Sequence, residues 1–189
     1  WLVQPLNCND SELVGANFEM DFQTDGSGGL DDDRIGWMIA NNTTSSSDIF
    51  SVQLDPGGGG QNIEGYWDGP SAADQRPSIV DTPTLGNNAW YRLHLGVTKL
   101  GSTSARVKVA LIELNNDGDP VEVVAVGSIA DTNALGSAGP NNKYFTPSNI
   151  YPAFKNHNAI SGAADTPHFD LLTAPSGSRT ITAQEWLNR

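Results

Sequence analysis

Acidic side chains crowd a glycine-rich loop between residues 25 and 33 of this 189-residue chain. The segment reads DGSGGLDDD, and its carboxylates belong to Asp25, Asp31, Asp32 and Asp33. A hard cation such as calcium takes six to eight oxygen ligands, which the carboxylates and carbonyls of a flexible loop can supply. Successive carboxylates also repel one another, and a bound cation would relieve that repulsion. We therefore expect a structural calcium site here, with a solvated acidic turn as the alternative.

Ionisable residues also alternate with apolar ones on two other segments. Glu19 and Asp21 share one parity, and so do Arg92 and His94. Because successive side chains of a strand point to opposite faces, each pair occupies one polar face. If both segments lie in one concave sheet, the pairs could bind a glycan or act on it. The same face would then also hold Arg34, Ser51 and Gln53, of which Gln53 is a candidate ligand-binding residue. The alternative is an outer sheet face linked by salt bridges.

Two further polar segments could contact a sugar. Tyr66, Trp67 and Asp68 end an expected short strand. An exposed Trp can stack on a sugar ring while a neighbouring carboxylate bonds the ring hydroxyls, although a Trp is more often buried in the core. Asn156 and His157 form a polar segment after another expected strand. A binding edge and a solvated turn explain that segment equally well.

Period-two alternation predicts how these residues are positioned. Alternating apolar residues mark strands over 18–23, 34–40, 50–55, 90–98, 106–111 and 121–126, with shorter ones near 63–67, 150–154 and 169–172. Turn-forming segments separate them, including an Asp-Gly hairpin turn within 115–119 and a long irregular stretch at 130–149. A capping-box pattern predicts a helical turn near 182–187. The pattern predicts an all-β, antiparallel sandwich of two sheets with a short C-terminal helical turn.

Composition narrows the classes of partner. The chain has 10 Lys and Arg against 22 Asp and Glu, a net charge of −12. Such a chain lacks the basic stripe that binds phosphate backbones, so nucleic acid and anionic membranes are poor partners. No run of 18 apolar residues predicts membrane insertion. The single cysteine, Cys8, excludes an internal disulfide, and we expect it to be a small buried hydrophobe; pairing between chains stays open.

Length predicts one domain over 1–189, with a core of about 14–173 and a tail of 174–189. The sequence shows no signal peptide, and its first residue is Trp1. We therefore expect a processed form or an excised piece of a longer extracellular or cell-surface protein.

The segment Trp90–Leu95 resembles the Trp-x-x-Val-x-Val strand of laminin G-like and concanavalin A-like domains. As in those domains, a long strand at 105–114 and a hairpin turn at Asp117-Gly118 follow it, while Tyr151–Phe154 and Phe169-Asp170 are similar to their last strands. The resemblance spans residues 14–173. It implies a jelly-roll sandwich with one concave sheet, which often faces carbohydrate, and often a structural calcium ion.

The resemblance also implies two possible enzyme chemistries. Glycoside hydrolases of this fold that cleave β-glucans carry Glu-x-Asp-x-Glu on one strand. Glu19 and Asp21 match that pattern, but Gln23 has no acidic proton. Polysaccharide lyases of related shape pair a His or Tyr base with an Arg or Gln that neutralises the substrate carboxylate, roles that His94 and Arg92 could take. Their longer sequence motifs are absent here.

These observations leave three hypotheses. The first is an extracellular, non-catalytic, lectin-like module that binds a polysaccharide or glycan and is stabilised by calcium. The second is a glycan-degrading hydrolase or lyase. The third is a structural or adhesive subunit that packs against neighbouring domains or subunits.

Overall fold

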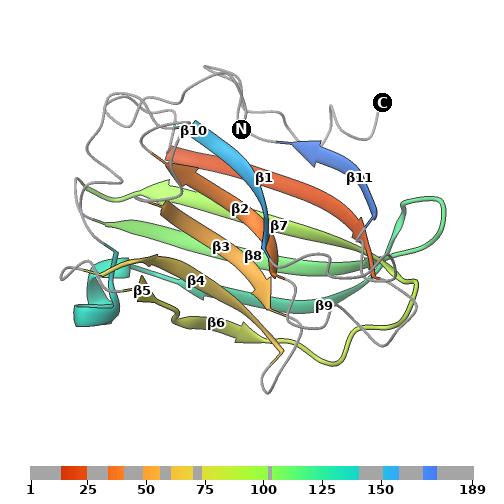
Figure 1. Cartoon of the computed structure of the whole chain (residues 1–189), viewed down its shortest axis with the longest axis horizontal. Helices are drawn as coiled ribbons and strands as arrows, with labels where there is room; N and C mark the ends of the chain where they lie inside the picture. Colours follow the sequence, from red (N-terminus) through yellow and green to blue (C-terminus); the bar gives the residue numbers. More distant parts are fainter. Residues whose placement is uncertain are drawn as a thin grey trace.

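The chain folds into two antiparallel sheets packed face to face (Figure 1). The computed structural model describes residues 14–24, 34–40, 49–55, 61–69, 74–101, 104–140, 151–157 and 168–173. One sheet has five strands in the order β11-β1-β7-β8-β9. The other has six, in the order β10-β2-β3-β4-β5, with β6 also paired to β4. This arrangement confirms the predicted all-β sandwich.

The strand bounds follow the alternation in the sequence closely. The five-stranded sheet contains β1 (Val14–Gln23), β7 (Trp90–Lys99), β8 (Ala105–Leu114), β9 (Pro120–Ile129) and β11 (His168–Thr173). The six-stranded sheet contains β2 (Arg34–Ala40), β3 (Ile49–Asp55), β4 (Asn62–Asp68), β5 (Asp74–Gln75), β6 (Ser78–Asp81) and β10 (Tyr151–His157). A short 3-10 helix, η2 (Thr132–Ala138), occupies part of the stretch predicted to be irregular. The helical turn predicted at 182–187 lies outside the described residues.

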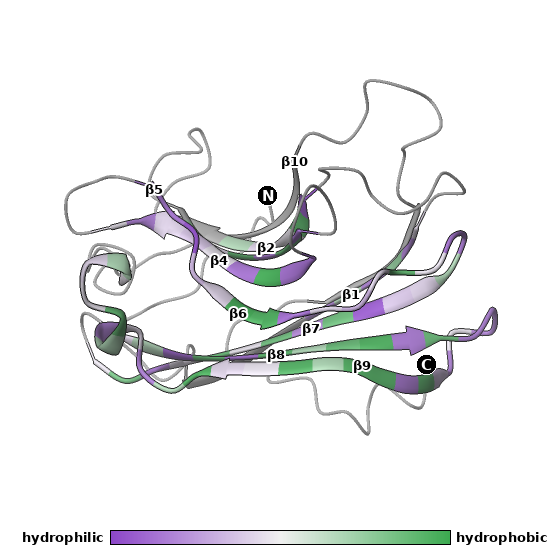
Figure 2. Cartoon of the chain, turned by 90° about the horizontal axis from the view of Figure 1, so that it is seen from below, coloured by the Kyte–Doolittle hydropathy of each residue, from purple (hydrophilic) through white to green (hydrophobic). Residues whose placement is uncertain are grey.

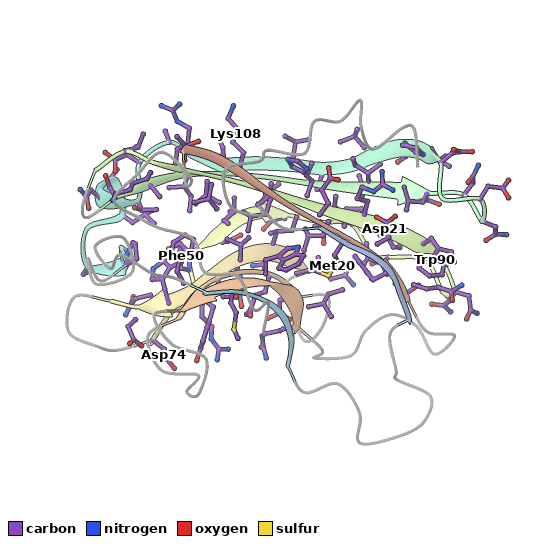
Figure 3. The ribbon with its side chains drawn as sticks, turned by 90° about the horizontal axis from the view of Figure 1, so that it is seen from above. Met20, Asp21, Phe50, Asp74, Trp90 and Lys108 are labelled. Atoms are coloured by element: carbon purple, nitrogen blue, oxygen red, sulfur yellow. The ribbon has the colours of Figure 1, made fainter. Side chains whose placement is uncertain are left out.

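Apolar side chains from both sheets meet between the two layers, which Figure 2 shows stacked one above the other. Figure 3 places Met20 and Phe50 between the layers, whereas Lys108 and Asp74 lie on the two outer sides. The Phe50 and Trp67 rings stack with their centroids 4.9 Å apart and an angle of 4° between their planes. Gly65 makes room for this stack, because a Cβ at that position would overlap the Trp67 ring. Burial of these side chains is the main favourable contribution to folding.

The predicted hairpin turn between β8 and β9 is confirmed. The Asn115 N–H donates to the Asp119 carbonyl oxygen at 2.9 Å, and Asn115 Oδ1 accepts from the Asp117 and Asp119 N–H groups. Gly118 has a φ of 85°, a conformation that residues with a side chain rarely adopt. The turn therefore needs both the asparagine and the glycine of the Asn115–Asp119 segment.

The strand β6 joins the two layers along one side of the sandwich. It pairs with β4 in the six-stranded sheet and also packs against β9 of the five-stranded sheet. The helix η2 makes a second connection, since the Trp67 Nε1–H donates to the Ala138 carbonyl oxygen at 2.9 Å. Within the described part of the chain, no helix has the length and apolar character needed to cross a membrane.

The close contact between β6 and β9 depends on Gly127, and Gly127→Ala tests it. A Cβ at Gly127 would lie 2.7 Å from Val80 Cβ and 2.9 Å from the Ile79 carbonyl oxygen. We expect the substitution to lower the free energy of unfolding by about 1–3 kcal/mol, because β6 must move away. Thermal and urea denaturation measure the effect. In the control Gly101→Ala the nearest atom would be Ser104 Oγ at 4.0 Å, so stability should change little. Equal melting temperatures for the two variants would contradict the inferred contact.

Candidate functional site

The outward side of the six-stranded sheet carries a row of polar side chains. Ile35, Val52 and Ile63 point into the core, so the residues that alternate with them point outward. We call this surface the outer polar face, and it consists of Arg34, Ser51, Gln53, Asp55, Asn62, Glu64 and Tyr66. Figure 2 shows the sheet curved, with its edge at β5 bending away from the five-stranded sheet. The outer polar face is therefore the concave side of that sheet.

Gln53 and Glu64 form a buried pair at the centre of this face. They lie directly opposite each other on β3 and β4, and Gln53 Nε2 donates to Glu64 Oε1 at 2.6 Å. Gln53 is 0% exposed and Glu64 is 5% exposed. The backbones are close here, because a Cβ at Gly36 on β2 would overlap the backbone of β3. The glycine thus lets β2 lie tightly against the strand that holds Gln53.

A guanidinium group links two carboxylates beside this pair. Arg34 Nε donates to Asp55 Oδ2 at 3.0 Å and lies 3.7 Å from Glu64 Oε1. The pKa of Glu64 is raised, first because burial disfavours its charged form and further because Asp55 repels it; Gln53, Arg34 and Arg76 oppose the rise. Glu64 therefore takes up a proton at a higher pH than an ordinary glutamate does.

Three oxygen atoms of the outer polar face are buried without a hydrogen bond within the described part of the chain. They are Ser51 Oγ, Asp55 Oδ1 and Asn62 Oδ1. Ser51 is 0% exposed, so its hydroxyl is fully covered although its position belongs to this face. Buried polar atoms are normally paired, and an unpaired one in a native protein calls for a specific explanation. All three atoms can accept a hydrogen bond, which a hydroxyl-rich ligand can donate.

Tyr66 lies opposite Ser51, on the β5 side of this face. Its hydroxyl donates to Asp74 Oδ2 at 3.1 Å, and the Arg76 guanidinium lies 5.1 Å from the centroid of its ring. The pKa of Tyr66 is raised, mainly by burial and then by the Asp74 carboxylate. Tyr66 therefore stays neutral and offers a hydroxyl and an aromatic ring at the rim.

The other residues predicted to bind a ligand fall in different places. Trp67 is 0% exposed and stacks on Phe50, so the prediction that it packs against a sugar is corrected: it is a core residue. Asp68 is half-buried at the end of β4, on the side of the sheet that carries Tyr66. In the register of β10 with β2, His157 lies opposite Arg34 and Asn156 opposite Ile35. Position 157 therefore belongs to the row of the outer polar face, and position 156 to the row of the core.

The ionisable pairs predicted on alternating segments lie on the other sheet. Arg92 donates to both Asp21 carboxylate oxygens, from Nε at 2.6 Å and from Nη2 at 2.7 Å. His94 Nδ1 lies 2.9 Å from Glu19 Oε1. These four residues share the outer face of the five-stranded sheet. The two outer faces point in opposite directions, so the expectation that these residues join Gln53 in one concave sheet is corrected. Their mutual pairing matches the alternative of a salt-linked sheet face.

The predicted calcium loop, Asp25 with Asp31, Asp32 and Asp33, lies outside the described residues, as does Cys8. Among the residues that the structure describes, no group of three or more His, Cys, Asp or Glu side chains is arranged to hold a metal ion.

Sequence reasoning did not single out Asp55, Asn62 or Glu64. The alternation around the expected strand near 63–67 was the available signal, because it assigns residues 62, 64 and 66 to one face. The alternation does not reveal that this face meets Gln53 and Asp55 of the preceding strand.

Comparisons with known proteins found only distant structural similarities. No protein-family model matches the chain, and no curated protein does. An alginate lyase from Pseudomonas aeruginosa has 10% sequence identity and a TM-score of 0.49 over 90% of this chain and 67% of its own. Scytalido-glutamic peptidase has 16% identity and a TM-score of 0.36 over 92% and 70%. An alginate lyase from Aplysia kurodai has 15% identity and a TM-score of 0.38 over 78% and 70%. The chain is thus distantly similar in structure to these proteins, and these scores carry no argument about its activity.

The raised pKa of Glu64 predicts a pH-dependent effect of Glu64→Gln on stability. Below the ordinary glutamate pKa of 4.5 both states of the wild type are protonated, so the variant and the wild type should melt at similar temperatures. As the pH rises through the higher pKa of the folded state, the unfolded state loses its proton first and the wild type loses stability. At pH 7 we therefore expect the variant to have the higher melting temperature, as measured by calorimetry from pH 3.5 to pH 7. A variant that is less stable at pH 7 than at pH 3.5, relative to wild type, would contradict the assignment.

Proposed function

We propose that this protein binds a polysaccharide on the outer polar face of the six-stranded sheet. The observation that carries the proposal is the hydroxyl of Ser51, which belongs to the row of that face and is fully buried without a hydrogen-bond partner within the described residues. Burying a polar group without a hydrogen bond costs folding free energy, and a ligand that supplies the hydrogen bond would offset that cost.

Sugar hydroxyls suit the groups around Ser51. Asp55 Oδ1 and Asn62 Oδ1 are further acceptors without partners within the described part of the chain, and a sugar hydroxyl can donate to each. The ring of Tyr66 at the rim can contact the apolar side of a sugar ring. A few placed polar groups with one aromatic side chain are typical of a small-molecule or glycan subsite.

The outer face of the five-stranded sheet is less suited to binding a ligand than the outer polar face. On the five-stranded sheet Asp21 and Arg92 satisfy each other, and Glu19 lies within bonding distance of His94. A ligand there would have to replace bonds that are already made. On the outer polar face a ligand would instead donate hydrogen bonds to acceptor atoms that have no partner within the described residues. Binding there would therefore break fewer existing hydrogen bonds.

Replacement of Ser51 by alanine tests the binding proposal. We expect Ser51→Ala to weaken the affinity for the bound polysaccharide about tenfold, the loss of roughly one hydrogen bond. A glycan array identifies the polysaccharide, and calorimetric titration measures the affinity. The matched control is Ser128→Ala, since Ser128 is exposed on the other sheet and should not change the affinity. If no glycan bound, or if both variants bound as the wild type does, the proposal would be wrong; a stable assembly without glycan binding would favour the structural-subunit hypothesis.

We also propose that the module works outside the cell and that calcium stabilises it through the acidic loop at residues 25–33. A ligand that binds only the folded state raises the melting temperature. We expect a higher melting temperature in millimolar calcium than in chelator, and a smaller difference for the double variant Asp31→Asn, Asp32→Asn. Identical melting curves with calcium and with chelator would contradict the calcium proposal. Recovery of the native protein only from the cytoplasm would contradict the extracellular location.

A further inference from the structure

The strand β9 lies at the edge of the five-stranded sheet and pairs with β8 on one side. Within the described part of the chain, no strand pairs with its other side. Along an antiparallel strand, alternate residues direct their backbone N–H and C=O groups toward opposite sides. The open edge of this ten-residue strand therefore presents a row of backbone donors and acceptors with which a further strand can pair.

The side chains of β9 expose apolar surface beside this open edge. Val121, Val123 and Val126 are 61%, 59% and 66% exposed, and in the described part of the chain Leu100 is the one other large hydrophobic residue that is exposed. Val123 lies opposite Ile112 of β8, on the outward side of the sheet. The strand thus combines exposed valines, which favour extended backbone, with unpaired backbone groups.

The edge of the six-stranded sheet at β5 and β6 is protected, in contrast to β9. These two strands have only two and four residues, and the exposed charged residues Asp74, Arg76 and Asp81 lie on or between them. Short length and charge are the usual ways in which proteins prevent an edge strand from pairing with another chain. Because β9 is long and its one charged residue is Glu122, we infer that a partner covers it.

The charges around β9 indicate which partner fits. The exposed cations Arg106 and Lys108 lie on the part of β8 that pairs with the last residues of β9. The exposed anions Asp117, Asp119 and Glu122 lie at the hairpin turn, where β9 begins. Two identical strands side by side in antiparallel orientation bring the cationic end of each copy beside the anionic end of the other. A parallel orientation would instead bring like charges together.

One acidic group also lies at the cationic end. Asp131 follows β9 and caps the helix η2, where its carboxylate accepts a hydrogen bond from the Asn133 N–H at 2.9 Å. The two cations on β8 outnumber this carboxylate, so the end keeps its positive sign.

We propose that two copies of this protein pair through β9 in antiparallel orientation about a two-fold axis. Their five-stranded sheets then form one continuous sheet, and the valines of both copies meet along the joined edges. Such an axis, perpendicular to the sheet, leaves both six-stranded sheets on the same side. The dimer does not depend on the binding function proposed above. If that function holds, the two outer polar faces point the same way, and one long polysaccharide could bind both.

Sedimentation velocity of the full chain over a range of concentrations tests the dimer. We expect a species with twice the mass of one chain. Val126→Lys should raise the dimer dissociation constant about tenfold or more, because it places a charge at the apolar contact. The control Leu100→Lys adds the same charge to an exposed apolar residue that follows β7 and should leave the dimer unchanged. Circular dichroism and thermal denaturation check that both variants fold.

Cross-linking tests the orientation of the two copies. In a Cys8→Ser background, the variants Val121→Cys and Ser128→Cys are each treated with a short bismaleimide, alone and mixed. The two positions lie near opposite ends of β9, so antiparallel pairing brings residue 121 of one copy near residue 128 of the other. We therefore expect links between the two variants in the mixture and few links within either variant alone.

The outcomes separate the dimer from the binding function. A chain that stays monomeric up to its highest soluble concentration, a dimer that Val126→Lys leaves intact, or links formed only within each variant would each overturn the proposed dimer. A monomer that binds glycan would leave the binding proposal standing. A dimer that binds no glycan would support the inference and contradict the binding proposal.

Discussion

The arrangement of this protein depends on burying the aromatic and aliphatic side chains of one parity between two sheets. The stack of Phe50 on Trp67 is the clearest case, because it aligns β3 with β4 at one position along their length. A shift of one residue would expose both rings and bury the polar row, so the register is strongly determined. Once that register is set, Gln53 must lie opposite Glu64 and Asp55 opposite Asn62. The polar chemistry of the outer face is thus a consequence of apolar packing on the inner face.

Closure of the sandwich on one side adds a second constraint. The strand β6 pairs with β4 in the six-stranded sheet and also contacts β9, where Gly127 allows the approach. The helix η2 then accepts a hydrogen bond from Trp67, so the same indole that packs the core also ties the layers to the loop after β9. Long-range contacts of this kind order β4, and β4 carries Glu64 and Tyr66.

The two outer faces differ in how far their polar groups are satisfied. On the five-stranded sheet, the bidentate Arg92–Asp21 pair makes two charge-assisted bonds across neighbouring strands. On the six-stranded sheet, one guanidinium serves two carboxylates, and several oxygens lack partners within the described part of the chain. Burial, and then repulsion by Asp55, raises the pKa of Glu64 on this face, and the incomplete pairing keeps acceptors available. Proteins commonly give up some stability at functional sites in this way, which is why we place function on this face.

The sequence by itself determined the strands, the two-sheet class and the hairpin turn at Asn115–Asp119, because strand alternation and turn chemistry are local properties. It also determined that Glu19 and Asp21 share a face. Only the tertiary structure decided that this face is salt-linked, that Trp67 belongs to the core, and that Glu64 meets Gln53, Arg34 and Asp55. Those facts depend on which strands become neighbours and which side of each sheet faces the other. Such pairings bring together residues that are far apart in the chain, so the local alternation of the sequence does not predict them.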